Sequence, residues 1–206
     1  MKKGISYLLT LGLLAGLISL PAQAQEAAPQ DAVAGFLTAI RSMEFPVSDT
    51  DRQKALITQA NAYLDLEALS KSALADHWET ATAEDRETFM GLLWSLIEVI
   101  AYPRSRDFLG DLEIRYPEIE PDSDGVMIHS IVVHEEEVLN AEVLYHVHEQ
   151  DSKWVIDDIF LDGISITEDL RYQWDKIIQE SAFSGLLDKM SERLAKTGEN
   201  SGKKAL

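Results

Sequence analysis

Cysteine is absent from this 206-residue chain, which excludes disulfide bonds and thiol catalysis. The chain also lacks a glycine-rich phosphate loop, a G-x-S-x-G nucleophile motif and an H-E-x-x-H metalloprotease motif. Basic residues are scarce, since 18 lysines and arginines stand against 36 aspartates and glutamates and give a net charge of −18. Such an acidic surface repels nucleic acid and anionic lipid head groups. We therefore discount nucleic-acid binding and expect no catalytic centre.

The first 24 residues have the pattern of a bacterial secretory signal peptide. Lys2 and Lys3 precede an apolar run over residues 5–20, and the small-x-small sequence Ala22-Gln23-Ala24 follows it. The run is short for a membrane anchor, and no second span follows. We expect cleavage after Ala24 and a soluble, periplasmic chain of 182 residues (206 less 24). The loss of Lys2 and Lys3 changes its net charge from −18 to −20.

The mature chain has the length of one domain with a full core. We expect a flexible leader over residues 25–30, the domain over residues 31–195 and a frayed polar tail over residues 196–206. Apolar residues recur at helical spacing in six segments. These segments are residues 31–43, 51–60, 65–75, 82–102, 167–181 and 183–195.

Residue types at the helix ends support these assignments. Asp65 is a suitable N-cap, and Thr82 opens the longest helix with acidic residues in its first turn. That helix is apolar almost all round from Phe89 to Tyr102, so it is enclosed on most sides or lines an apolar space. Pro103 then ends or kinks it.

Four extended runs lie between the two groups of helices, at residues 112–119, 126–134, 138–148 and 153–161. Short polar loops separate them, which predicts an antiparallel meander. The order of elements predicts an α+β fold in which helices from both ends of the chain wrap a four-stranded antiparallel sheet. Simple alternation in the last run puts Trp154, Ile156 and Phe160 on one face. Val155, Ile159 and Leu161 fall on the other, so we expect both faces to be covered.

Polar residues of the strands are weak candidates for chemistry. His146 and His148 share a face, which we expect to be solvated, and they would need His129 or His134 to approach a zinc site. No fourth ligand can be placed, so we expect no metal. Adjacent strand residues point in opposite directions, which argues against Asp157 and Asp158 as an acid/base pair.

A buried Asp158 needs a partner. One candidate is Arg171, on the helix that returns over the last strand. The alternative is that both side chains reach water.

Two long stretches of sequence resemble the MlaC family. They are YLDLEALSKSALADHWETATAEDRETFMGLL at residues 63–93 and VLYHVHEQDSKWVIDDIFLDGISITEDLRYQWDKIIQESAFSGLLDKM at residues 143–190. The order and spacing of single residues carry the resemblance over about residues 31–195. These residues are Asp65, Glu67, His77, Trp78, Thr82, Arg86, Phe89, Tyr145, Trp154, Asp158, Gly163, Ser165, Arg171, Gln173 and Trp174.

The resemblance implies a function. The family's members are periplasmic phospholipid-binding auxiliary proteins of the Mla lipid-transport ABC system, also known as toluene-tolerance proteins, and they are not enzymes. They hold acyl tails in a deep pocket and carry lipid between an inner-membrane ABC transporter complex and an outer-membrane lipoprotein complex. By resemblance, this chain maintains outer-membrane lipid asymmetry with phospholipid as ligand and no cofactor. A family relative encoded with hopanoid-synthesis genes leaves hopanoid, or another hydrophobic ligand, as an alternative.

Three departures from the family pattern stand out. Trp174 occupies a position where the family usually has Phe, Pro103 lies where the family helix tends to continue, and the strong acidity is unusual. The larger side chain of Trp174 would narrow the pocket, and the acidity leaves the docking surfaces open.

We predict an apolar lipid cavity between the sheet and the helices. Its expected lining residues are Phe89, Leu92, Leu93, Leu96, Ile100, Tyr102, Val143, Tyr145, Val147, Trp154, Trp174 and Ile177. Trp78, Asp158, Gly163 and Arg171 are expected to have structural roles. Other functions on the same scaffold are a lipid sensor that never releases its ligand, or an enzyme that uses Asp158 or a histidine. The second is disfavoured because no nucleophile–base pair can be placed.

Overall fold

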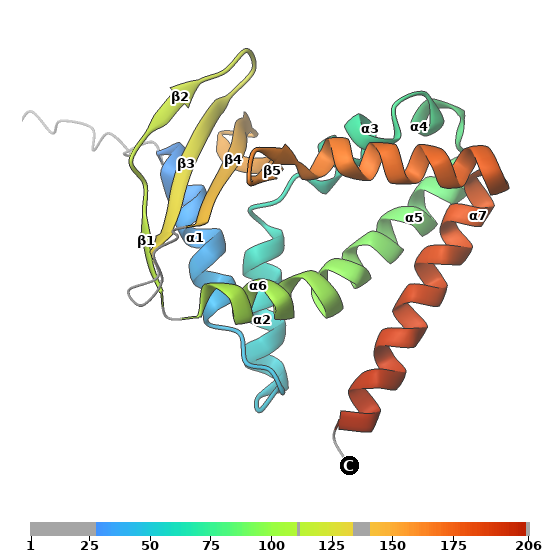
Figure 1. The fold of residues 1–206 in the computed structure, drawn as a ribbon, viewed down its shortest axis with the longest axis horizontal. Helices are drawn as coiled ribbons and strands as arrows, with labels where there is room; N and C mark the ends of the chain where they lie inside the picture. Colours follow the sequence, from blue (N-terminus) through green and yellow to red (C-terminus); the bar gives the residue numbers. More distant parts are fainter. Residues whose placement is uncertain (1–27, 111, 134–140, 205–206) are drawn as a thin grey trace, which may run out of the picture.

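The computed structural model of the protein describes residues 28–110, 112–133 and 141–204, with side chains described as far as Thr197. A twisted antiparallel sheet forms one end of the molecule, and helices form the other (Figure 1). The helical elements are α1 (Pro29–Arg41), α2 (Thr50–Asn61), α3 (Leu66–Leu74), α4 (Asp76–Thr80), α5 (Ala83–Leu96), η1 (Ile97–Ala101), α6 (Tyr102–Leu109) and α7 (Ile166–Lys204). The predicted signal peptide and its cleavage site after Ala24 lie outside the described residues.

The helix starts follow from the predicted caps. The side chain of Asp65 accepts a hydrogen bond from the backbone N–H of Ala68 at 2.9 Å, and α3 begins at the next residue. The hydroxyl of Thr82 accepts from the N–H of Asp85 at 3.1 Å at the start of α5. Both predictions are confirmed. Helix α1 begins at Pro29, two residues before the predicted start and within the predicted leader.

The longest predicted helix changes its winding before Pro103. Residues Ile97–Ala101 form the π-helical segment η1, and α6 then carries Pro103 in its first turn. Proline has no N–H to donate, and its ring crowds the preceding turn of an α-helix. A π-helical turn is one of the known ways to absorb that disturbance. The predicted kink therefore takes the form of wider winding, and the chain stays helical as far as Leu109.

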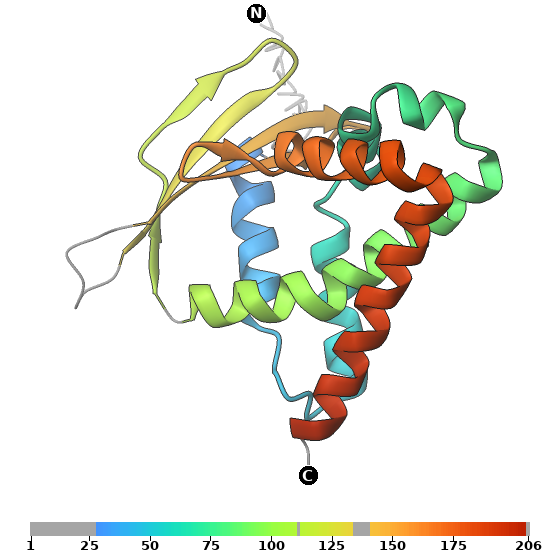
Figure 2. The same cartoon turned by 45° about the vertical axis from the view of Figure 1, so that its right-hand side comes forward.

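Helix α7 has two arms. Ser181 (φ −143°, ψ 16°) and Ala182 (φ 58°, ψ 179°) are not helical and divide it at the predicted position. Helix α7 contacts both α3 and α5, and its second arm turns back beneath the first (Figure 2). The helix continues to Lys204, whereas a frayed tail was expected from residue 196 onward.

Over the described residues, the sheet has six strands rather than the predicted four. They are β1 (Glu113–Arg115), β2 (Ile119–Pro121), β3 (Val126–Val133), β4 (Ala141–Gln150), β5 (Lys153–Leu161) and β6 (Ile164–Ser165). The first predicted run is split around Pro117, and its two pieces, β1 and β2, both pair with β3. The short β6 pairs with the end of β5 through a turn at Asp162 and Gly163, both at positive φ. The meander β3–β4–β5 is confirmed, whereas His134 and the predicted loop at residues 135–137 lie outside the described residues.

A β-bulge changes which residues of β5 share a face. His146 pairs with Asp158, but the next residue of β4, Val147, pairs with Ile156, so Asp157 is the extra residue. An inserted residue reverses the alternation beyond it. Ile156 therefore lies on the same face as Ile159 and Leu161. The expected grouping of Ile156 with Phe160 was wrong, because simple alternation does not allow for a bulge.

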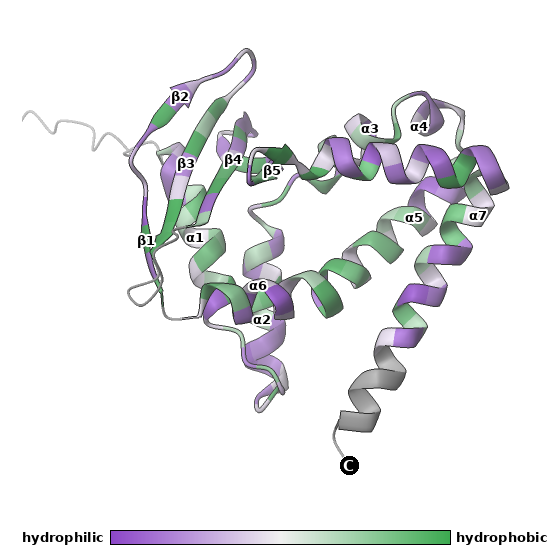
Figure 3. Cartoon of the chain, in the orientation of Figure 1, coloured by the Kyte–Doolittle hydropathy of each residue, from purple (hydrophilic) through white to green (hydrophobic). Residues whose placement is uncertain are grey.

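Two clusters of buried apolar residues hold the fold together. The first joins α1 and α6 to the inner face of the sheet and includes Phe36, Ile40 and Ile128. The second joins α3, α5 and both arms of α7 and includes Phe89 and Leu186. Apolar residues gather along α1 and α5, and polar residues alternate with them on α7 (Figure 3). Within the described part of the chain, no helix combines the length and the apolar character needed to cross a bilayer.

Candidate functional site: an apolar cavity between the sheet and the helices

A cavity of about 670 Å³ lies between the two clusters. Its volume is in the range of pockets that hold small organic ligands. It is bounded by α1, the α2–α3 connection, α3, the α5–η1–α6 helix, strands β4 and β5, and both arms of α7. Its lining residues are Phe36, Leu37, Ile40, Leu64, Leu66, Leu69, Leu93, Leu96, Ile97, Ile100, Ala101, Tyr102, Ser105, Phe108, Leu109, Val143, Tyr145, Ile156, Asp157, Asp158, Ile159, Leu161, Ile166, Leu170, Gln173, Trp174, Met190 and Arg193.

Seven of the twelve residues predicted as lipid contacts line this cavity. They are Leu93, Leu96, Ile100, Tyr102, Val143, Tyr145 and Trp174. The other five belong to the surrounding packing instead. Phe89 belongs to the second cluster, and Leu92 and Ile177 pack against it. Val147 belongs to the first cluster, and Trp154 packs against that one. Phe89 is fully buried, and its ring meets that of Trp174 edge to face at 5.0 Å, so it supports a cavity residue from behind.

Helix α1 was not among the elements predicted to line the cavity. Its residues Phe36, Leu37 and Ile40 line the cavity, as do Leu66 and Leu69 of α3. The apolar stripe of α1 was visible as a helical repeat. A stripe that packs against side chains and one that faces an open space have the same sequence pattern, so the pattern alone could not assign these residues to the cavity.

The lining is polar at few positions. Only Ser105, Asp157, Asp158, Gln173 and Arg193 carry a charge, an amide or an aliphatic hydroxyl among its 28 residues. Phe108 and Leu161 line the cavity and are also 46% and 47% exposed, so the cavity reaches the surface beside them. Exposed apolar side chains at an opening suit a ligand that is apolar and enters from outside.

Tyr102 fixes the π-helical wall of the cavity. Its hydroxyl donates to Oδ1 of Asn61 at 2.7 Å, and Nδ2 of Asn61 donates to Oε1 of Glu98 at 3.0 Å. The Tyr102 side chain is almost fully buried. Burial and the nearby Glu98 carboxylate raise the pKa of this phenol well above its ordinary value, so it stays a neutral donor. This chain of bonds ties α2 to η1.

Asp158 binds backbone and hydroxyl donors, and the expected pair with Arg171 is not formed. Its carboxylate accepts from Ser165 Oγ at 2.5 Å and from the N–H groups of Ile159 at 2.8 Å and Thr167 at 3.1 Å. It thereby satisfies a donor in the first turn of α7. Arg171 instead donates to the carbonyl of Ser72 at 2.6 Å, which joins α7 to α3. The pairing was wrong because the turn at Gly163 brings closer donors to Asp158.

Trp78, predicted to be structural, lies buried in α4 within the second cluster. The Arg86 guanidinium lies 5.5 Å from the centre of its ring and donates to the carbonyl of Glu79 at 3.1 Å. These contacts join α4 to α5 and close the end of the helical layer away from the sheet.

The two strand histidines are not on a solvated face, contrary to expectation. Nδ1 of His146 lies 2.6 Å from Asp157, and Nδ1 of His148 lies 3.1 Å from the same carboxylate. Burial disfavours the charged form of His146, but the hydrogen bond and the charges of Asp157, Asp124 and Asp122 outweigh it and raise its pKa. The bulge at Asp157 makes this arrangement, because it turns that carboxylate toward β4.

Comparisons with known proteins agree with this geometry. A sequence model described as MlaC protein matches residues 30–192. The fold is similar to the solved structure of a phospholipid-binding protein from Ralstonia solanacearum in complex with a phospholipid, with a TM-score of 0.68 and 20% identity. That alignment covers 82% of this chain and 96% of the other. Curated protein sequences yielded no match. The resemblance seen in the sequence is confirmed, and this chain belongs to the MlaC family.

Proposed function

We propose that this protein is a periplasmic carrier that holds the acyl tails of a phospholipid in the apolar cavity. The observation that carries the proposal is the cavity itself, about 670 Å³ with five polar positions among 28 lining residues. An acyl chain in this cavity gains packing contacts with its apolar walls. Family membership and the phospholipid in the Ralstonia solanacearum relative support the choice of ligand.

The head group would stay at the opening. Phe108 and Leu161 mark the place where the lining meets solvent, and the exposed Arg193 also belongs to the lining. A guanidinium suits a lipid phosphate because it offers several donors to its oxygens. The tails would then extend inward toward Tyr145 and Trp174.

Energetics suit a passive carrier. Each methylene removed from water gains about 0.8 kcal/mol, so two acyl chains would leave the cavity for water at a cost on the order of 20 kcal/mol. Passage between two apolar environments costs far less. Lipid would therefore move by direct docking to an inner-membrane ABC transporter complex and an outer-membrane lipoprotein complex, and the partners would set the direction. We place the mature chain in the periplasm after cleavage behind Ala24.

A vesicle-transfer assay tests the carrier role. Donor vesicles with a fluorescent phospholipid and acceptor vesicles without it are mixed with the protein, and labelled lipid is measured in the acceptors. A carrier moves label in proportion to its concentration. A protein that takes up label and never delivers it is a sensor or structural subunit, which contradicts the carrier role while leaving lipid binding intact. Competition by a hopanoid, with none by phospholipid, would contradict the ligand class.

A further inference from the structure

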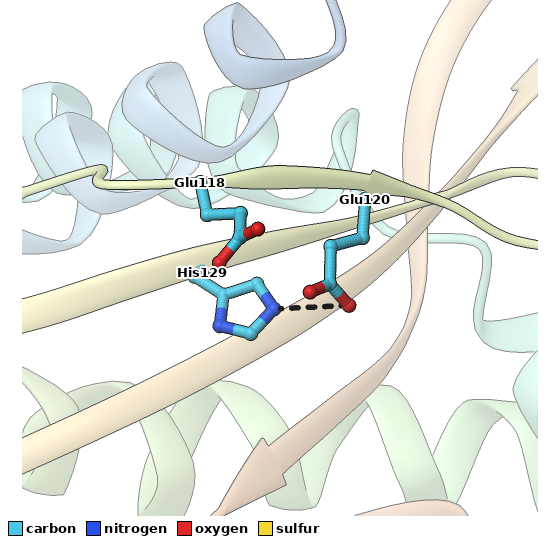
Figure 4. Close-up of side chains that lie close together, drawn as sticks. All are labelled: Glu118, Glu120 and His129. Carbon is cyan, nitrogen blue, oxygen red and sulfur yellow. Dashed lines mark ion pairs between the residues drawn. The ribbon is translucent and has the colours of Figure 1, made fainter.

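Three side chains capable of metal coordination converge on the β2–β3 hairpin, away from the lipid cavity. Glu118 immediately precedes β2, Glu120 lies within it, and His129 lies opposite on β3 (Figure 4). The backbone fixes the pairing, because the N–H of His129 donates to the carbonyl of Glu118 at 3.1 Å. Ile128 is buried in the first cluster, so the neighbouring His129 side chain points to the opposite face of the sheet.

His129 lies between two carboxylates. Its Nδ1 is 3.4 Å from Oε1 of Glu142 on β4, and its Nε2 is 3.5 Å from Oε2 of Glu120. The side chain is 17% exposed, but the Nε2 atom itself is buried and has no hydrogen-bond partner among the described residues. A buried ring nitrogen without a partner is costly unless another group satisfies it.

The Nε2 atom faces negative charge. When Nδ1 carries the proton and faces Glu142, the lone pair of Nε2 points toward Glu120. In this tautomer Nε2 is an acceptor, and a cation held between it and the carboxylate would be bound by both. One ligand atom from each of Glu118, Glu120 and His129 falls within 4.8 Å of the other two, so a single ion can reach all three after small side-chain rotations.

We propose that Glu118, Glu120 and His129 bind a divalent transition metal of the zinc class. An imidazole nitrogen with two carboxylate oxygens is a donor set that zinc accepts, with water as the fourth ligand. Ligand atoms of a tetrahedral zinc site lie about 3.4 Å apart, given metal–ligand bonds of about 2.1 Å. The 3.5 Å between Nε2 and Glu120 matches that spacing. Glu142 acts as the outer carboxylate that orients the imidazole.

The metal would strengthen the edge of the sheet. Strand β2 has three residues, all exposed, and pairs only with β3 within the described sheet. A metal held by both strands ties β2 to the body of the sheet and neutralises part of a strongly acidic surface. This inference concerns a separate face of the molecule and does not depend on lipid binding.

Zinc titration by calorimetry on the mature, full-length protein tests the proposal. We expect saturable binding of one zinc ion per chain at neutral pH. His129→Gln removes the nitrogen ligand and should weaken binding by roughly 100-fold or more, and Glu142→Gln should weaken it by roughly 10- to 100-fold, the usual effect of losing an outer-shell partner. Slower amide hydrogen exchange in β2 after zinc addition gives a second readout. A general effect of zinc on the acidic surface would not confine the slower exchange to that strand.

Matched histidine variants provide the controls. His77→Gln removes a histidine that pairs with Asp175 at 2.8 Å on the helical side, and His146→Gln removes another carboxylate-flanked histidine of the sheet. Both should retain wild-type zinc affinity. The proposal would be overturned by any of three results: no saturable zinc binding in the wild type, wild-type zinc affinity in His129→Gln, or loss of zinc binding in His146→Gln. Circular dichroism of every variant checks that the fold is intact.

Discussion

Replacing Ile100 by Asp places a carboxylate in the wall of the lipid cavity. Ile100 lies in η1, lines the cavity and is only partly buried, so water can hydrate the new carboxylate when the cavity holds no lipid. We therefore expect the free energy of unfolding of the lipid-free protein to fall by only about 1 kcal/mol. The effect on a bound acyl chain should be much larger.

The loss of lipid affinity has two parts. Removing the contact between an isoleucine side chain and the acyl chain costs about 2 kcal/mol. A carboxylate enclosed by lipid must either lose its hydrating water or take up a proton. Protonating an aspartate at neutral pH costs about 4 kcal/mol, and this value is the upper bound on the free-energy cost of enclosing the carboxylate. Because Ile100 is only partly buried and water can still reach part of the new side chain, we take about half of that bound. The total of about 4 kcal/mol corresponds to roughly 1,000-fold weaker binding.

Val99→Asp is the matched control. Val99 is the adjacent residue of η1, is 43% exposed and does not line the cavity. Both variants add the same charge to the same helical turn. Binding of a fluorescent phospholipid, measured at several protein concentrations, should show the large loss in Ile100→Asp and near wild-type affinity in Val99→Asp. If both variants lose affinity equally, or if both keep wild-type affinity, the assignment of this wall to the lipid is refuted.

Three further predictions concern stability. Asp158→Asn weakens the charge-assisted bonds at the start of α7, so we expect about 2 kcal/mol lower stability in denaturant titrations, with unchanged lipid content; a loss of lipid alone would contradict the structural role. Ala182→Gly relieves a backbone conformation that favours glycine, so the melting temperature should rise by an amount equivalent to about 1 kcal/mol; a lower melting temperature would contradict the strain. Burial raises the pKa of the Tyr102 and Tyr145 phenols. At pH values above the unfolded pKa of about 10, the unfolded chain loses these protons while the folded protein keeps them, so the free energy of unfolding falls by about 1.4 kcal/mol per pH unit for each tyrosine. Tyr102→Phe should make the decline shallower by about 1.4 kcal/mol per pH unit in alkaline unfolding experiments, and an unchanged slope would contradict the shift.

The sequence predicted the order of elements well because local signals were strong. Polar loops separated the strands, and Asp65 and Thr82 marked two helix starts that the structure confirms. Pro103 indicated a disturbance of the helix, but the proline alone did not show that the chain would accommodate it as the π-helical segment η1 and stay helical. Pro117 splits the first predicted strand in two, which a stricter reading of proline in a strand would have suggested.

The site was harder to predict because its details are not local. The bulge at Asp157 reverses the faces of β5, and nothing in the alternation of residues 154–161 reveals it. The expected pair of Asp158 with Arg171 gave way to donors that the turn at Gly163 supplies. An apolar residue such as Phe36 has the same pattern whether it fills a core or borders an open space.

The most direct test of the central claim is native mass spectrometry of the wild-type protein purified without detergent. We expect a species heavier than the mature chain by the mass of one phospholipid, and extraction should release that lipid for identification. A mass equal to that of the chain alone, together with no uptake of phospholipid from vesicles, would contradict the claim that the cavity between the sheet and the helices holds lipid.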